Sequence, residues 1–203
     1  MKTTRLEAFS DGVIAILITI MVLELKVPHG ETFDTLTALW PVFLSYVLSF
    51  IYLGIYWNNH HHMLHACQRV TGGILWANLH LLFWLSLVPF STGWMGENHF
   101  APHTAALYGA NLLMAAIAYY ILQTLIIRAQ GPDSLLARAV GGDWKGKLSP
   151  ILYAAAIALA FRYPGVSLTI YIVVAAIWLI PDTRIERVLG GEWSGAGGAQ
   201  DKK

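Results

Sequence analysis

The sequence predicts an all-α membrane protein with six transmembrane helices, and three observations support this fold class. Hydrophobic residues make up 56% of the 203 residues, only 12% are charged, and the mean hydropathy is +0.55. Soluble domains carry about 25% charged residues, so most of this chain must lie in an apolar solvent. The apolar runs and the positions of the positive charges between them then give the number and direction of the helices.

Six apolar runs are candidate spans, because a helix needs roughly 20 apolar residues to cross the hydrocarbon core of a bilayer. Pro28 follows the first run, and Gly131 follows the fourth. The fifth begins at Ser149 and Pro150, which suits a helix start. The last two runs are short and require a tilted helix or a thin bilayer. The expected spans are residues 6–26, 35–57, 70–92, 104–128, 148–162 and 166–181.

The positive charges predict the orientation, because segments on the cytoplasmic side carry an excess of Lys and Arg. With the N-terminus in the cytoplasm, eleven of the thirteen Lys and Arg residues fall in inside segments, and only Lys26 and Arg162 fall outside. We therefore expect a multi-pass protein with both termini in the cytoplasm. Residues 1–189 would form one six-helix domain, and residues 190–203, rich in Gly, a disordered cytoplasmic tail.

Composition also argues against several classes of function. A net charge of +1 gives no sign of a nucleic-acid partner. The one cysteine, Cys67, excludes an intramolecular disulfide framework and a zinc site built on cysteines. The sequence shows no nucleophile-and-base pattern and no phosphate-binding glycine loop. We therefore expect neither an enzyme nor a bound cofactor.

Ser10 and Asp11 stand at the start of the first apolar run, residues 13–25. A carboxylate beside a membrane segment is costly, so it usually has partners and often has a function. One explanation is that these residues cap the N-terminus of the helix. The alternative is that the helix already includes Arg5 to Ala8, which would place Asp11 inside it.

Helix geometry separates this polar pair from an apolar stripe on the same helix. The stripe contains Ile16, Ile20 and Leu23, with Thr19 at its border. Because successive residues rotate by ~100°, Asp11 lies ~140° from Ile16 and points in a different direction. The pattern alone allows the stripe to face lipid, a neighbouring helix or a pore narrowed by apolar side chains.

Polar residues near the ends of the second and third spans are candidate partners for Ser10 and Asp11. They are Trp57, His60 and His61 in the second span, and Trp76 and Asn78 in the third. These segments share the cytoplasmic side of the predicted topology, so their side chains would lie at a similar depth. Hydrogen bonds among them would hold the first three helices together, since a buried acid without donors is expensive.

Four histidines fall within six residues here: His60, His61, His62 and His65. Imidazoles at i and i+4, such as His61 and His65, can bind one metal ion. No carboxylate lies near them in the sequence, so we favour a polar helix end and expect no metal site. Two alternatives remain: a metalloenzyme or haem protein using these residues and His80, and a proton-conducting or proton-coupled transporter using Asp11 and the histidines.

The chain resembles the bacterial form of the transmembrane protein 175 family, the endolysosomal potassium channels. The residues that carry the resemblance are Arg5, Phe9, Ser10, Asp11, Gly12 and Val13, followed by Ala15, Ile16, Thr19, Leu23 and Glu24. Trp57, His60, His61, Trp76 and Asn78 support it, as do residues 88–92. The resemblance covers most of residues 5–92, whereas the last three spans agree only in number and length.

This resemblance implies a modestly potassium-selective channel in the inner (plasma) membrane, a homotetramer of six-helix subunits whose first helix lines a central pore. The sequence contains no Thr-Val-Gly-Tyr-Gly filter, and rings of apolar side chains control ion passage in the family. Carried over by position, the constriction is Ile16, Ile20 and Leu23, and Thr19 is a polar ring. The implied partners are further copies of the chain, potassium ions and the lipid bilayer.

The resemblance also implies a structural role for the polar residues around Asp11. They would fix the first helix to its neighbours rather than contact ions. This implied network contains Arg5, Phe9, Ser10, Asp11, Trp57, His60, His61, Trp76 and Asn78.

Overall fold

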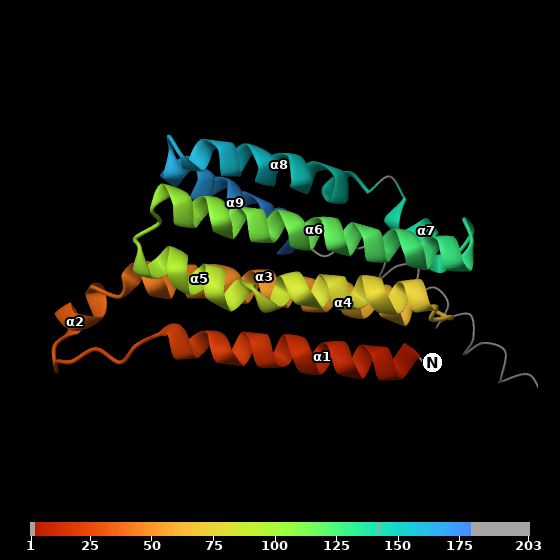
Figure 1. The fold of residues 1–203 in the computed structure, drawn as a ribbon, viewed down its shortest axis with the longest axis horizontal. Coiled ribbons are helices and arrows are strands. Elements are labelled where there is room, and N and C mark those ends of the chain that lie inside the picture. The colour runs from red at the N-terminus through yellow and green to blue at the C-terminus, as the bar shows by residue number, and fades with distance from the viewer. Residues whose placement is uncertain (1–2, 142, 180–203) are drawn as a thin grey trace, which may run out of the picture.

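The computed structural model describes residues 3–141 and 143–179, and these form an all-helical bundle (Figure 1). The predicted all-α class is confirmed. The helices are α1 (Thr3–Ile20), a 3₁₀ turn η1 (Met21–Glu24), α2 (Phe33–Thr37), α3 (Trp40–His65), α4 (Gly72–Ser86), α5 (Val88–Glu97), α6 (Pro102–Gln130), α7 (Leu135–Val140), α8 (Trp144–Ala160) and α9 (Pro164–Leu179).

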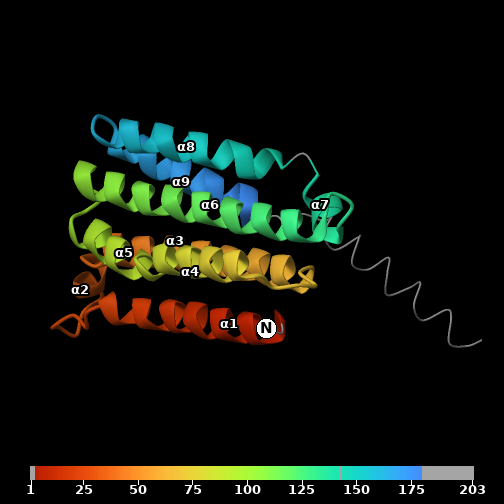
Figure 2. The same ribbon diagram turned by 45° about the vertical axis from the view of Figure 1, so that its right-hand side comes forward.

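The long helices run side by side in layers. In both views α1 lies at one edge and α8 at the other, with α3, α4, α5 and α6 between them (Figures 1 and 2). The helix α1 packs against α3, α4 and α5, whereas α6 packs against α8 and α9 as well as α4 and α5. Because α1 is an outer helix, its neighbours cover only one of its sides.

Local sequence explains where several helices begin and end. A proline lies in the first turn of α3, α5, α6 and α9, where the missing backbone N–H would have no partner in any case. The Thr71 side chain accepts a hydrogen bond from the Ile74 amide at 3.3 Å and caps α4. At the end of α6, Gly131 has a φ of 94°, a backbone conformation that suits glycine.

Four helical segments of the described residues are long and apolar enough to cross a membrane: Thr3–Glu24, Trp40–His65, Gly72–Glu97 and Pro102–Gln130. They correspond to the first four predicted spans. The helix α3 runs on to His65, beyond the predicted end at residue 57, because the His-rich segment is helical although it is polar. A shorter apolar helix, α9, matches the start of the sixth predicted span.

The helix start predicted at Ser149 and Pro150 is wrong, because α8 begins at Trp144 and Pro150 lies inside it. The side chain of Asp143 accepts a hydrogen bond from the Gly146 amide at 3.0 Å and so caps the helix six residues before Ser149. The predicted tail at residues 190–203 and the last two residues of the sixth predicted span lie outside the described residues.

Ser10 and Asp11 lie in the interior of α1, so the capping explanation for them is wrong. The helix begins about two turns earlier, as the helical character of Arg5 to Ala8 suggested. Their side chains are therefore free to reach neighbouring helices.

Two clusters of buried side chains hold the layers together. The first joins α1, α3, α4 and α6, and includes Ile14, Leu53, Leu81 and Leu122. The second joins α3, α6, α8 and α9 through four tyrosines: Tyr52, Tyr108, Tyr153 and Tyr171. Hydroxyl groups of these tyrosines form hydrogen bonds inside the bundle. Tyr52 donates to the Tyr171 carbonyl at 2.6 Å, and Tyr171 donates to the Ala105 carbonyl at 3.0 Å.

Beside this second cluster, Gly109 on α6 packs closely against Tyr171 on α9. A Cβ atom added at Gly109 would overlap the Tyr171 hydroxyl group and would lie 2.7 Å from its ring carbon Cζ. Tyr171 is fully buried and cannot easily move aside. The glycine thus allows α6 and α9 to pack with the tyrosine between them.

Replacing Gly109 with alanine should therefore destabilise the subunit. We expect Gly109→Ala to cost about 1–3 kcal/mol, the usual cost of overpacking a core, and to lower the thermal unfolding midpoint in detergent. The matched control is Gly54→Ala on α3, where nothing lies within 4 Å of an added Cβ. Equal midpoints for the two variants would contradict this account of the α6–α9 contact.

Candidate functional site

A chain of three fully buried polar side chains joins α1, α3 and α4. The Asn78 Nδ2 group on α4 donates to Ser10 Oγ on α1 at 2.9 Å, and Asn78 Oδ1 lies 2.7 Å from His60 Nε2 on α3. Because an amide oxygen only accepts, His60 Nε2 carries the proton and donates. Ser10 in turn donates to the Leu6 carbonyl of its own helix at 2.9 Å. Asn78 thus uses both ends of its amide to connect three helices.

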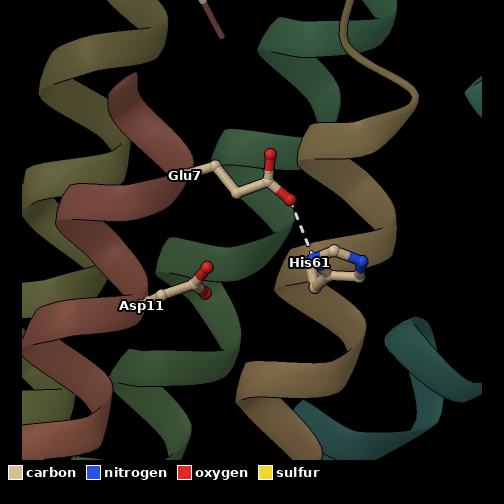
Figure 3. Close-up of side chains that lie close together, drawn as sticks. All are labelled: Glu7, Asp11 and His61. Carbon is tan, nitrogen blue, oxygen red and sulfur yellow. Dashed lines mark ion pairs between the residues drawn. The ribbon is translucent and has the colours of Figure 1, made fainter. Parts of the chain in front are cut away.

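A second polar set joins α1 to α3 alone, and Figure 3 shows three of its members, Glu7, Asp11 and His61. The Trp57 indole N–H donates to Asp11 Oδ1 at 3.1 Å, and His61 Nδ1 lies 2.8 Å from Glu7 Oε1. Both carboxylates point from α1 toward α3. Glu7 is not among the residues predicted from the sequence, although its position four residues before Asp11 places the two acids on the same side of a helix.

Three predicted members of the network lie elsewhere. Arg5 is exposed, the Phe9 side chain is 52% exposed and that of Trp76 is 75% exposed. In the described part of the chain they take no part in the two hydrogen-bonded sets. Their role in such a network stays a prediction.

The apolar stripe lies on the uncovered side of α1 and continues into η1, which contains Leu23. Ile16 is 59% exposed, Ile20 40% and Leu23 76%. Thr19 is also exposed, and its hydroxyl donates to the Ile16 carbonyl at 2.9 Å. The opposite side holds buried residues such as Ser10 and Ile14. The two hydrogen-bonded sets, which together form the polar anchor of α1, and the apolar stripe therefore face different directions.

Contacts near both ends of α1 add to this anchor. Thr3 Oγ1 donates to the Cys67 carbonyl at 3.0 Å. Beyond the other end, the Lys26 ammonium forms an ion pair with Glu97 at the end of α5. A hydrogen bond from Lys26 to Glu97, together with the attraction between their charges, raises the pKa of this lysine above its usual value.

Residues 5–89 match the model of a protein family described as the endosomal/lysosomal potassium channel TMEM175. A potassium channel of Chryseobacterium sp. (strain P1-3) is 56% identical over 189 residues, which cover 93% of this chain and 98% of that relative. The chain belongs to the TMEM175 family. It is a potassium channel of this family and a multi-pass membrane protein, and the prediction that it is not an enzyme is confirmed.

Two further TMEM175 relatives extend this result. The crystal structure of a lysosomal potassium-selective channel TMEM175 homolog from Chamaesiphon minutus has a TM-score of 0.76 and 30% identity, covering 89% of this chain and 97% of that one. The endosomal/lysosomal proton channel TMEM175 of Gallus gallus is 34% identical over 79 residues, 33% of this chain and 16% of that protein. Membership of this non-enzymatic family also excludes the metalloenzyme alternative.

The buried hydrogen-bonded chain should contribute to the stability of the subunit. We expect Ser10→Ala to cost about 1–3 kcal/mol, because it leaves an N–H of Asn78 buried without its acceptor. The control is Ser86→Ala, since Ser86 is exposed and bonds only to the Phe83 carbonyl of its own helix at 2.7 Å. Thermal unfolding of both variants in one detergent measures the difference in stability. An unchanged midpoint for Ser10→Ala would contradict a stabilising role of this hydrogen-bonded chain.

Proposed function

We propose that the chain conducts potassium as a homotetramer in which α1 of each subunit lines a central pore. The observation that carries this proposal is the uncovered stripe along α1 and η1, in which Ile16 on α1 and Leu23 on η1 are more than half exposed in the single subunit. In a membrane helix such a side can face lipid, another copy of the chain or a pore, and the similarity to a potassium channel favours the pore.

The tight packing inside the subunit favours an ion path between subunits over an ion path within one subunit. The side of α1 that faces α3 and α4 is closed by fully or almost fully buried side chains, among them Ile14, Leu17, Leu53 and Leu81. Such a packed apolar layer offers no hydrated route for an ion. An ion path along α1 must therefore run on its exposed side, where copies of the chain meet.

In this arrangement Ile16, Ile20 and Leu23 form stacked apolar rings, and Ile16 is the narrowest. An isoleucine ring supplies no ligands, so selectivity arises from the cost of partly dehydrating the ion, which is lower for potassium than for sodium. The Thr19 hydroxyl already donates to the Ile16 carbonyl. Its oxygen keeps lone pairs for a passing cation, which favours a modest selectivity.

The hydrogen-bonded sets behind α1 serve as the structural network. We further propose that Phe9 and Trp76, both largely exposed in one subunit, are covered by a neighbouring copy. The helices α8 and α9 complete six spans, although their 17 and 16 residues make them short for a bilayer. Residues 1–189 are then one channel domain with its N- and C-termini in the cytoplasm.

The test is the substitution Ile16→Asn, studied by potassium flux into liposomes. A polar ring should hydrate the constriction, and lowering the barrier by about 1.4 kcal/mol would raise flux about tenfold. Selectivity for potassium over sodium should fall at the same time.

The matched control is Ile151→Asn on α8, because Ile151 is 65% exposed and α8 lies across the bundle from α1 (Figure 1). It should conduct as the wild type does. If Ile16→Asn left both the flux and the ion selectivity unchanged, α1 would not line the pore.

A second candidate function is proton conduction, and the contact of Glu7 with His61 beside Asp11 favours it. The relative in Gallus gallus is named as a proton channel. Asp11→Asn keeps an acceptor for the Trp57 indole but removes the charge. Under a pH gradient with the membrane potential clamped, this variant should lose proton flux while keeping potassium flux if Asp11 relays protons. Equal proton flux in both proteins would reject this candidate.

A further inference from the structure

We propose that Glu7, Asp11 and His61 bind a divalent transition metal ion, such as Zn²⁺, that links α1 to α3. One ligand atom from each residue, two carboxylate oxygens and one imidazole nitrogen, all lie within 4.8 Å of one another. Tetrahedral ligands of one zinc ion at about 2.0–2.2 Å lie roughly 3.4 Å from each other, so side-chain rotations must bring these atoms up to about 1.4 Å closer together. Both carboxylates already point toward His61 (Figure 3).

The charge of this cluster favours a cation. Two carboxylates lie side by side on α1, and like charges at this spacing repel. The groups that α3 brings to them are the neutral indole N–H of Trp57 and the titratable ring of His61. Neither is a fixed positive charge, whereas a divalent ion would neutralise both acids.

The cluster is also open to ions and partly shielded from water. The His61 side chain is 46% exposed and that of Glu7 18%, and Asp11 is half-buried. Ions can reach such a position, and the reduced local dielectric strengthens their attraction to the carboxylates.

The donor set selects the class of metal. Two oxygens and one imidazole nitrogen suit Zn²⁺ and its neighbours, with water in the remaining positions. Ca²⁺ and Mg²⁺ prefer shells made of six or more oxygen atoms. The metal takes the place of the Nδ1 proton that faces Glu7: in a neutral ring this proton moves to Nε2, and a protonated ring releases it to water.

This site differs from the pair of histidines that the sequence suggested. The rings of His61 and His65 are stacked, with centroids 6.1 Å apart, but His65 is not a member of the cluster. The expectation of no metal site depended on the lack of a nearby carboxylate in the sequence. The fold supplies two from α1.

A bound ion would tie α1 to α3 close to Trp57 and so restrict movement of α1. In this respect the inference rests on the proposed function, because restricting a pore-lining helix should reduce potassium flux. Binding itself does not depend on where the pore lies, so it is measured first.

The experiment is calorimetric titration of Zn²⁺ into the purified full-length protein, without an affinity tag, in detergent. We expect one ion per subunit and a thermal unfolding midpoint that rises with Zn²⁺. Glu7→Gln should weaken binding by at least about tenfold and lose this rise, as should Asp11→Asn. A tenfold excess of Mg²⁺ should not compete.

The matched control is His65→Gln, which should bind Zn²⁺ as the wild type does. Three results would overturn the proposal: no binding to the wild type, unchanged affinity in Glu7→Gln, or loss of binding in His65→Gln. The last would identify a site on the histidines of α3 alone. Wild-type binding that depends on Glu7, together with normal flux in Ile16→Asn, would support the metal site while rejecting the proposed pore.

Discussion

The position of α1 depends above all on the Asn78 side chain. Its amide group donates to Ser10 and accepts from His60, so one residue connects α1 and α3 through α4. Within a membrane these bonds have no water to replace them, and a buried amide without partners would be costly. Since Ser10 is a fixed point on α1, the bond sets the rotation of the whole helix. A rotation by a single residue, about 100°, would turn the exposed stripe into the bundle.

The packing of apolar side chains holds α1 in the same position as these hydrogen bonds do. The buried side of α1 fills the space against α3 and α4, whereas the tyrosine cluster joins α3 and α6 to α8 and α9. The two clusters therefore meet at α3 and α6, which hold the outer helix and the last two helices in one frame. A helix that is firmly held on one side and open on the other suits the pore-lining role proposed for it.

Much of this arrangement could be predicted from the sequence. Apolar runs gave the helices, and the rotation per residue separated Asp11 from Ile16, because both are local properties. Trp76 could not be judged in this way, since its exposure depends on which side of α4 meets its neighbours. The role of Glu7 was not predicted for a similar reason. An acid near a helix end usually is a solvated surface charge, and only the fold shows that His61 lies beside this one. The start of α8 was missed because Pro150 looked like a first-turn proline, and the cap at Asp143 was not considered.

The division of α1 into an anchored side and an open side has a consequence for how such proteins can diverge. Substitutions at Ile16, Ile20 or Leu23 remove little packing within the subunit, because these side chains are largely exposed there. Substitutions at Ser10 or Ile14, both fully buried, disturb the fold directly. Residues on the open side can therefore be substituted while the subunit keeps its fold. If the open side lines the pore as proposed, ion preference and foldability are inherited on separate sides of the first span.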